Sequence, residues 1–380
     1  MRQARVISIA AALGALACRA LGAQGTLSTQ GFGYPAGGTS TRNAGAGGAL
    51  GEFDPLSPLN PAALAAWGPT GLYFQLSPEY RTTGSAGGTD KTTTVRFPLL
   101  SAAIPLGDRW TFGASSTTFL DRTWRTEKRG VEQFADDSAP YSQTFGVSGS
   151  INETRIAAAY RFGSAIRFGV AGHVFTGSNR LKVVRLFDDT TGRFGSFNQA
   201  SQISYAGGAF SAGVDVRPAS VIALAFSARV GGTLRSYSGD TVLTSASTPK
   251  HYAGSLVFTG LAGTNVGVRA AWDGWSSLST LGDTLVKGVD GWDVSVGGET
   301  RGVSFGGNTL PLRAGVRWRT LPFAIGLSKV KETAIGGGLG IPLAAGRANI
   351  DLSLQRANRT GVPGVTEHAW LLGLGFTVRP

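Results

Sequence analysis

An alternation of apolar and polar residues with a period of two runs through about 310 residues of this chain, from near residue 72 almost to its end. Between residues 310 and 319, for example, Leu312 and Trp318 occupy one set of alternate positions, and Arg313 and Arg317 occupy the other. Successive side chains of a strand point to opposite faces, so this pattern predicts a sheet with one apolar and one polar face. No long window has a helical period, and no apolar run approaches the roughly 20 residues of a membrane helix.

The alternating segments are too long for a soluble β-sandwich, which is the other fold with one apolar sheet face. They run for about 9 to 20 residues, whereas strands in soluble proteins usually have about 5 or 6. Their polar faces combine Gly, Ser, Arg and Asp, a mixture suited to a wet lumen. Six tryptophans fall near segment ends, as in the aromatic girdles of membrane barrels: Trp110, Trp124, Trp272, Trp292, Trp318 and Trp370. We therefore predict an all-β fold, a 14-stranded antiparallel transmembrane β-barrel.

The predicted strands are joined by connections that alternate between short and long. The strands cover residues 72–81, 92–105, 110–124, 142–162, 165–184, 200–217, 221–236, 250–261, 264–278, 290–302, 310–319, 333–343, 347–356 and 368–379. Short periplasmic turns and long external loops are the arrangement of bacterial outer-membrane barrels. Long external loops are predicted at residues 125–141, 185–199, 237–249 and 279–289. The connection over residues 302–309 is longer than its periplasmic place predicts.

Residues 42–67 differ from everything that follows them. A run of small residues from Ala44 to Ala49 precedes several prolines and an alanine-rich stretch. Asn is favoured as an N-cap, Pro at the first helical position and Ala inside a helix, so we predict a helix of about two turns that starts at Asn60. A helix that short needs an enclosing surface to stabilise it. We predict that residues 24–70 form a hatch or plug inside the barrel of residues 71–380, the alternative being an N-terminal arm on its surface.

Residues 1–23 have the anatomy of a secretory signal peptide. Arg2 and Arg5 precede an apolar run, and small residues lead to the expected cleavage site after Ala23. The single cysteine, Cys18, raises a lipoprotein alternative, but Leu16 stands one position away from the usual place before such a cysteine. Cleavage after Ala23 would remove Cys18, which excludes disulfides, thiolate metal sites and cysteine nucleophiles from the mature chain.

Composition and motifs argue against several classes of function. The net charge of +12 comes from scattered arginines, whereas nucleic-acid-binding proteins cluster their basic residues on one face with aromatic residues between them. The three histidines, His173, His251 and His368, are isolated. An outer-membrane lipid hydrolase would need a histidine near the lipid face; His368 shares that face with Trp370, but no motif pairs it with a serine. We therefore expect no nucleic-acid partner, no metal or cofactor and no catalytic residue. His173 is predicted to face the lumen.

The segment RNAGAGGALGEFDPLSPLNPAALA, which begins at Arg42, is similar to the N-terminal hatch of the outer-membrane long-chain fatty acid transporter (FadL-type) family. In that hatch a run of small residues precedes Asn-Pro-Ala. Residues 149–162 and 332–359 also resemble strands of the family, and fourteen strands match its barrel. The resemblance implies a non-enzymatic barrel in the bacterial cell outer membrane, which takes up long-chain fatty acids or similar hydrophobic compounds passively. An apolar ligand enters from outside, and a shift of the hatch releases it sideways through a gap in the wall.

The resemblance also implies roles for particular residues. It places in the hatch, as gating residues, Asn60, Pro61, Ala62, Gly45, Gly47 and Gly48, the glycines allowing close packing against the wall. Proline interrupts sheet pairing, so Pro98, Pro105 and Pro342 are candidates for the gap, the alternative being ordinary strand-end prolines. No ligand-binding residue is assigned.

The expected partners are outer-membrane lipids, a hydrophobic small-molecule ligand and the barrel-assembly machinery. The final residue is Pro380 rather than an aromatic one, so Phe376 or Trp370 is expected to serve in assembly recognition. Two alternatives remain open. A related barrel could act as a partner or shuttle in protein secretion, with the long loops binding protein, and a general porin could pass polar solutes, although a hatch argues against an open pore.

Overall fold

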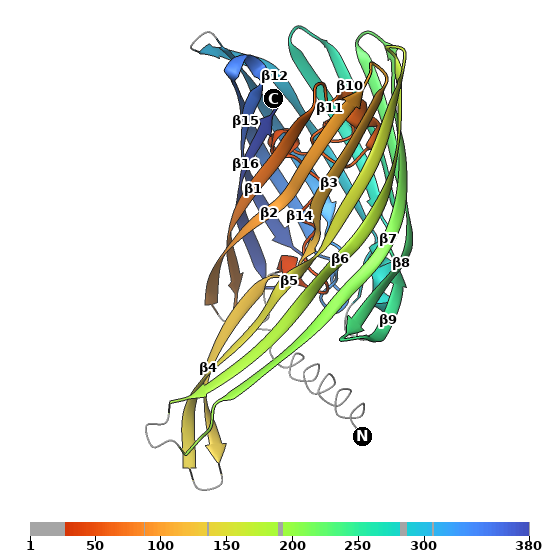
Figure 1. Cartoon of the computed structure of the whole chain (residues 1–380). Coiled ribbons are helices and arrows are strands. Elements are labelled where there is room, and N and C mark those ends of the chain that lie inside the picture. The colour runs from red at the N-terminus through yellow and green to blue at the C-terminus, as the bar shows by residue number, and fades with distance from the viewer. Residues whose placement is uncertain are drawn as a thin grey trace.

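The computed structural model describes residues 27–86, 88–134, 137–188, 193–281, 287–305 and 308–379. The predicted signal peptide, residues 1–23, lies outside the described residues, as do the first residues of the predicted hatch and Pro380. The described chain forms one antiparallel sheet of 16 strands that closes on itself (Figure 1). None of the described helices is long and apolar enough to cross a membrane.

Within the described residues, all strands except β4 and β9 follow one another around a closed ring, in which β1 is hydrogen-bonded to β16. The ring strands are β1 (Gly71–Ser85), β2 (Gly88–Leu106), β3 (Trp110–Asp121), β5 (Asp137–Phe162), β6 (Ile166–Phe187), β7 (Phe197–Ala219), β8 (Ile222–Ser238), β10 (His251–Leu261), β11 (Thr264–Asp273), β12 (Gly291–Phe305), β13 (Asn308–Thr320), β14 (Lys331–Leu343), β15 (Ala348–Thr360) and β16 (Thr366–Val378). The predicted antiparallel barrel is confirmed, and each ring strand overlaps one predicted segment.

The outer face of the barrel is apolar and the inner face is polar. On β5 and β7, Ile156 and Phe210 are 70% and 73% exposed, whereas their sequence neighbours Arg155 and Ser211 are 5% and 8% exposed. A sheet whose apolar residues are the exposed ones is built for a lipid solvent rather than for water. Exposed tryptophans lie near strand ends of this outer face, as predicted: Trp110, Trp292, Trp318 and Trp370.

The two ends of the barrel differ in their connections. At the end that we name the turn end, β1 begins, β16 ends, and the strands are joined by short turns at residues 107–109, 163–165, 220–221, 262–263 and 344–347, the last containing η4 (Ala344–Gly346). We name the opposite end the loop end, because longer connections occur there. The prediction of a long connection over residues 302–309 is wrong, because β12 continues to Phe305 and β13 begins at Asn308.

Two expected loops contain further strands, so their description as loops is wrong. β4 (Trp124–Phe134) pairs along its whole length with β5, and β9 (Thr241–Ser247) pairs with β8. Together with the outer parts of β5, β6 and β7, β4 forms an arm that extends beyond the ring at the bottom of Figure 1. The strand predicted over residues 264–278 also ends earlier, at Asp273, and is followed by η3 (Trp275–Thr280). Neither face needs to be apolar outside a bilayer, so the arm lacks the pattern used to predict strands.

Residues 27–67 lie inside the ring, as the red segment of Figure 1 shows. They begin near the loop end with η1 (Leu27–Thr29), where the Ser28 hydroxyl donates to Glu367 at 2.8 Å. They continue through α2 (Thr41–Gly45) and η2 (Pro61–Ala66) to the turn end. The helix predicted from Asn60 is therefore present as a 3₁₀-helix with Asn60 as its N-cap, and the surface-arm alternative is wrong.

Candidate functional site

The small-residue run of the hatch lies directly on glycines of the barrel wall. A Cβ atom at Gly45 would lie 2.9 Å from the Cα of Gly338, and one at Gly47 would lie 2.6 Å from the backbone of Gly315. A Cβ atom at Gly315 would in turn lie 2.2 Å from the carbonyl oxygen of Ala46. These distances are shorter than real Cβ contacts. The hatch can therefore pack against the wall here only because the hatch and the wall both have glycine at the points of contact.

Gly48 has a different reason to be glycine. A Cβ atom there would lie 3.5 Å from the Ser295 hydroxyl, which is an ordinary contact. Its φ of +92°, however, lies in a region that L-residues with side chains rarely adopt. The backbone conformation, rather than close packing, therefore requires glycine at this position.

The Asn-Pro-Ala element of the hatch is fitted to a second pair of wall glycines. The Asn60 side-chain oxygen accepts from the Ala62 N–H at 2.9 Å and so caps η2, while its amide donates to the Glu52 carbonyl at 3.1 Å. Gly169 and Gly213, which are opposite each other on β6 and β7, lie against this element. The Asn60 side chain therefore contacts both the hatch, at Glu52, and the wall, at Gly213.

Replacement of Gly213 by alanine is expected to unseat this part of the hatch. The new methyl group would lie 1.9 Å from the Asn60 side-chain oxygen, which is fixed by its hydrogen bonds. Overpacking of this kind costs about 1–3 kcal/mol. The rate of limited proteolysis within residues 42–67 should rise by about 5- to 150-fold, since about 1.4 kcal/mol corresponds to a factor of 10.

A matched control is Gly172→Ala, on the neighbouring strand. A Cβ atom there would meet its nearest neighbour, the Phe210 ring, at 3.9 Å. This variant should be cleaved at the wild-type rate. Equal cleavage of both variants would show that the Asn60 contact does not hold the hatch.

Two ion pairs attach the hatch to the wall. Arg42 donates to the Glu299 carboxylate on β12 from Nε at 3.0 Å and from Nη2 at 2.7 Å. Burial lowers the pKa of Arg42, but the carboxylates of Glu299, Asp54 and Asp351 together raise it by more, so the guanidinium stays charged. Glu52, which is fully buried, accepts from Arg269 at 2.9 Å and from the Ser227 hydroxyl at 2.7 Å.

Tyr34 ties the hatch to several strands at once. The guanidinium carbons of Arg96, Arg319 and Arg359 lie 5.4, 4.8 and 4.6 Å from the centre of its ring, within the range of cation–π contacts. Burial raises the pKa of Tyr34, so its neutral hydroxyl donates to the Glu332 carboxylate at 3.0 Å. The three arginines come from β2, β13 and β15, so a single hatch side chain joins distant parts of the wall.

The hydrogen-bond ladder between β2 and β3 stops partway along the barrel. It runs from Leu106↔Trp110 to Leu99↔Thr117. In the described sheet residues 88–96 of β2 are paired with β1 alone, and residues 97 and 98 have no partner in either ladder. Pro98 directly precedes the last pair and has no N–H to donate.

The three prolines proposed for a gap therefore differ. Pro105 and Pro342 lie inside continuous ladders, opposite Thr111 and Asn349, whereas Pro98 lies at a break. A bulge in the β1–β2 ladder, between Gln75 and Ser77, falls at the same level. The wall is thus interrupted between β2 and β3 on the loop-end side of Leu99.

Beyond this break, β3 has an edge that does not pair with β2. The hatch lies along that edge. Tyr34 and Asp121 exchange two backbone hydrogen bonds, both of 2.8 Å, as residues of neighbouring strands do. A Cβ atom at Gly33 would lie 2.2 Å from the Asp121 carbonyl oxygen, and one at Gly37 would lie 2.4 Å from that of Thr118. A movement of residues 33–37 would therefore uncover the edge of the break.

Apolar side chains fill the lumen near the loop end. Their rings are in contact, with centroids 6.0 Å apart for Phe32 and Tyr205, 4.8 Å for Phe119 and Phe175, and 5.4 Å for Phe119 and Trp275. We name this group the apolar constriction; it consists of Phe32, Phe119, Leu120, Ile151, Phe175, Tyr205, Ala209, Leu234, Ala246, Trp275, Leu278, Leu281 and Phe323. Such a constriction disfavours water and ions but accommodates an apolar molecule.

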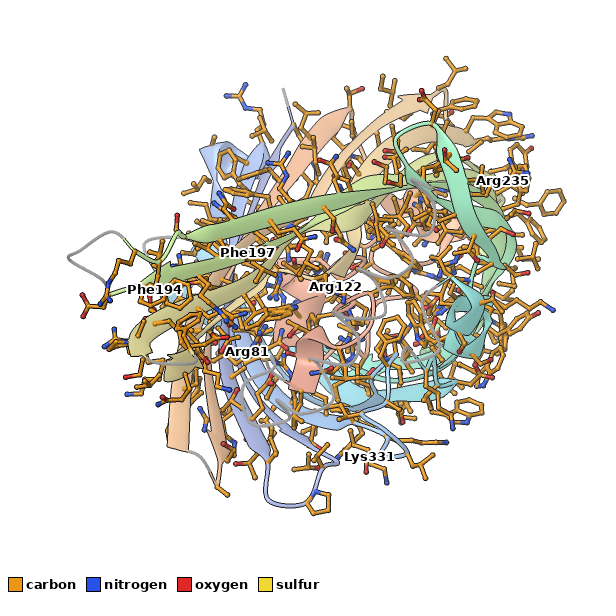
Figure 2. All side chains as sticks on the ribbon, turned by 90° about the horizontal axis from the view of Figure 1, so that it is seen from below. Arg81, Arg122, Phe194, Phe197, Arg235 and Lys331 are labelled. Carbon is orange, nitrogen blue, oxygen red and sulfur yellow. The ribbon has the colours of Figure 1, made fainter. Side chains whose placement is uncertain are left out.

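Arg122 lies beside the apolar constriction, inside the ring of strands (Figure 2). Its buried Nε atom has no hydrogen-bond partner among the described residues. Burial lowers the pKa of Arg122, and only the Tyr205 hydroxyl acts against this. A partly buried cation that has no counter-charge among the described residues is costly, so this position favours an incoming anionic group.

A polar cavity of about 120 Å³ adjoins both the hatch and the apolar constriction. Two histidine–carboxylate pairs line it. His173 contacts Glu153, and the Nδ1 atom of His251 lies 2.7 Å from the Oδ1 atom of Asp273. Among the described residues, His, Cys, Asp and Glu form no group of three or more suited to a metal ion. The cavity therefore places two histidine–carboxylate pairs next to the hatch.

The sequence predicted some of these features and missed others. The six hatch residues and the lumenal face of His173 were identified, and the structure brings the hatch residues onto the wall; their role in gating remains a prediction. The constriction, the position of Arg122 and the cavity were missed. Strand parity alone could have assigned Glu153, His173 and Ser211 to the same lumenal face, because they lie on three consecutive strands.

Comparison with known proteins supports the fold. No protein-family model and no curated protein matches the sequence. Among solved structures, a FadL homologue from Pseudomonas aeruginosa is 16% identical, with a TM-score of 0.63 over 90% of this chain and 98% of that one. The toluene transporter TbuX of Ralstonia pickettii is 15% identical, with a TM-score of 0.56 over 90% and 99%. The toluene transporter TodX of Pseudomonas putida is 17% identical, with a TM-score of 0.53 over 90% and 97%. The chain therefore has the fold of the FadL-type barrels.

Proposed function

We propose that this protein carries apolar small molecules, fatty acids among them, passively across the outer membrane of a bacterium. The observation that carries the proposal is a lumen filled along its axis by the hatch, beside a wall whose β2–β3 ladder is broken. An apolar molecule gains roughly 25 cal/mol for each Å² of surface removed from water, so a sideways exit into lipid avoids an uphill step into an aqueous pore.

The orientation follows from the connections and the exposed girdle. The turn end faces the periplasm and the loop end with its β-arm faces outwards, as in other outer-membrane barrels. The ligand would then meet the apolar constriction first, pass beside the hatch and leave between β2 and β3 near Leu99. The predicted signal peptide, and the likeness to barrels described as toluene transporters, support this direction and class of cargo.

Arg122 supports an acidic head group on the cargo. Its Nε is buried next to the apolar constriction, and Arg122 forms no ion pair with a carboxylate among the described residues, so a fatty acid would supply a counter-charge while its chain contacts the constriction. A neutral hydrocarbon would contact the same apolar surface but would leave Arg122 without a counter-charge. The proposed cargo is therefore a fatty acid in preference to a neutral hydrocarbon.

Arg122→Met is expected to weaken palmitate binding by about 10- to 100-fold, because a hydrogen bond to a charged group contributes about 1.5–3 kcal/mol. Toluene binding should stay unchanged. Titration calorimetry of the purified barrel measures both affinities, and Arg125→Met, which removes a nearby exposed arginine, is the matched control. An equal loss for both ligands, or no loss for either, would contradict the role of Arg122 as the carboxylate partner.

The proposed transport itself is tested by uptake. Bacteria that express the wild-type chain should accumulate radiolabelled palmitate faster than cells without it, whereas uptake of a labelled disaccharide of porin size should not change. Faster entry of the disaccharide would favour the porin alternative. Unchanged uptake of both solutes would leave no support for transport.

A further inference from the structure

Three side chains on consecutive strands form a chain of contacts on the wall of the polar cavity. His173 on β6 contacts Glu153 on β5 through Nδ1, and its Nε2 lies 2.7 Å from the Ser211 hydroxyl on β7. All three residues line the cavity, and His173 and Ser211 are 6% and 8% exposed. The cavity thus contains a serine, a histidine and a carboxylate in series.

The order of these contacts fixes the direction of proton transfer. A carboxylate only accepts hydrogen bonds, so in the neutral imidazole the Nδ1 atom of His173 carries the hydrogen and donates to Glu153. Nε2 is then the acceptor, and the Ser211 hydroxyl donates to it. This is the arrangement in which a histidine acts as a general base towards a serine nucleophile and a carboxylate holds the ring in the required tautomer.

A cation lies next to the serine and the carboxylate. Arg229 on β8 is directly opposite Ser211 in the β7–β8 ladder, and its Nη1 lies 3.5 Å from the Glu153 carboxylate. Its buried Nε has no partner among the described residues. The guanidinium therefore has donor capacity left for a negative oxygen that develops next to Ser211.

The same cavity has an apolar side. Phe119 and Trp275, which belong to the apolar constriction, line it together with Ser211. The Arg229 guanidinium carbon lies 5.2 Å from the centre of the Phe119 ring. A compound with a polar carbonyl group and a short apolar part would place the carbonyl near Ser211 and the apolar part against these rings.

We propose that Ser211, His173 and Glu153 form a hydrolytic site in the lumen, which cleaves carboxylic esters with a short apolar acyl group. Ser211 Oγ forms a bond to the carbonyl carbon and gives its proton to His173 Nε2, while the carbonyl electron pair moves to the oxygen facing Arg229. The bond to the leaving alcohol breaks, and the alcohol takes the proton from Nε2. Water then attacks the acyl-serine through the same base, which releases the acid and restores the Ser211 hydroxyl.

The full-length barrel, purified in detergent, is treated with diisopropyl fluorophosphate, and its peptides are analysed by mass spectrometry. One adduct is expected, on Ser211. Ser115 lines the same cavity, and its hydroxyl has no partner among the described residues, so it is the internal control and should stay unmodified. Ser211→Ala should abolish the adduct, and His173→Gln should slow its formation by at least about tenfold.

Hydrolysis of p-nitrophenyl butyrate gives an independent measurement. The wild-type rate should exceed that of Ser211→Ala by about 100-fold or more, with folding checked by heat-modifiable gel mobility. Glu153 is a positioning residue, so Glu153→Gln should lower kcat with little change in KM. An unmodified Ser211, or equal hydrolysis rates for wild type and Ser211→Ala, would overturn the proposal and leave a purely structural hydrogen-bond network.

Discussion

Deletion of residues 27–67 is expected to convert a closed barrel into a conducting one, with single-channel conductance in planar bilayers rising by at least about tenfold. These residues occupy the lumen from Ser28, bonded to Glu367, to Trp67, whose carbonyl accepts from Arg379 at 3.3 Å. Gly68 lies just before β1 at the turn end, so the shortened chain enters the first strand without crossing the lumen. What remains is a ring of strands lined by arginines and carboxylates, a surface suited to water and ions.

A smaller deletion, of residues 42–67, shows which part of the hatch closes the lumen to ions. It keeps Phe32 in the apolar constriction and Tyr34 among its three arginines, so we expect lower conductance than in the larger deletion. Equal conduction by the wild type and both deletion variants would remove the hatch hypothesis and favour a porin. If no variant conducts although all are folded, a barrel that binds a protein partner becomes the better explanation.

The sequence predicted the barrel well because the bilayer imposes a simple rule on its strands. Each residue of a ring strand faces either lipid or lumen. The residue type alone therefore indicates that the apolar Ile156 faces lipid and the charged Arg155 faces the lumen. β4 and β9 were missed for the same reason, since beyond the bilayer both faces meet water and the alternation disappears. The length of β5, 26 residues, shows how far a strand continues after its sequence signal has ended.

The contacts that hold the hatch required the three-dimensional structure. Tyr34 meets Arg319 across 285 residues of sequence, and no local pattern reports such a contact. Gly213 looks like any other glycine in a strand, although it accommodates Asn60. Sequence periodicity assigns a residue to a face but does not give its level along the barrel, which depends on strand register and stagger.

The second large effect is expected at the buried pair of Arg269 and Glu52. Arg269→Met removes the cation that contacts Glu52 at 2.9 Å. It leaves a fully buried carboxylate whose only remaining side-chain hydrogen-bond partner among the described residues is the Ser227 hydroxyl. Breaking a buried pair in this way costs about 3–5 kcal/mol, which is about two to four powers of ten in the ratio of unseated to seated hatch. Conductance of the variant should therefore show frequent openings, and protease should cut within residues 42–67.

Glu52→Gln combined with Arg269→Met separates this effect from a general loss of stability. The double variant has no unpaired carboxylate at this position, and Asp293 keeps its contact with Arg317 Nε at 2.8 Å, so most of the closed state should return. Arg301→Met, at an exposed arginine of β12, should behave like the wild type. Failure of the double variant to close again would show that Arg269 acts through packing of its side chain, whereas a single variant as closed as the wild type would mean that the other hatch contacts suffice without this pair.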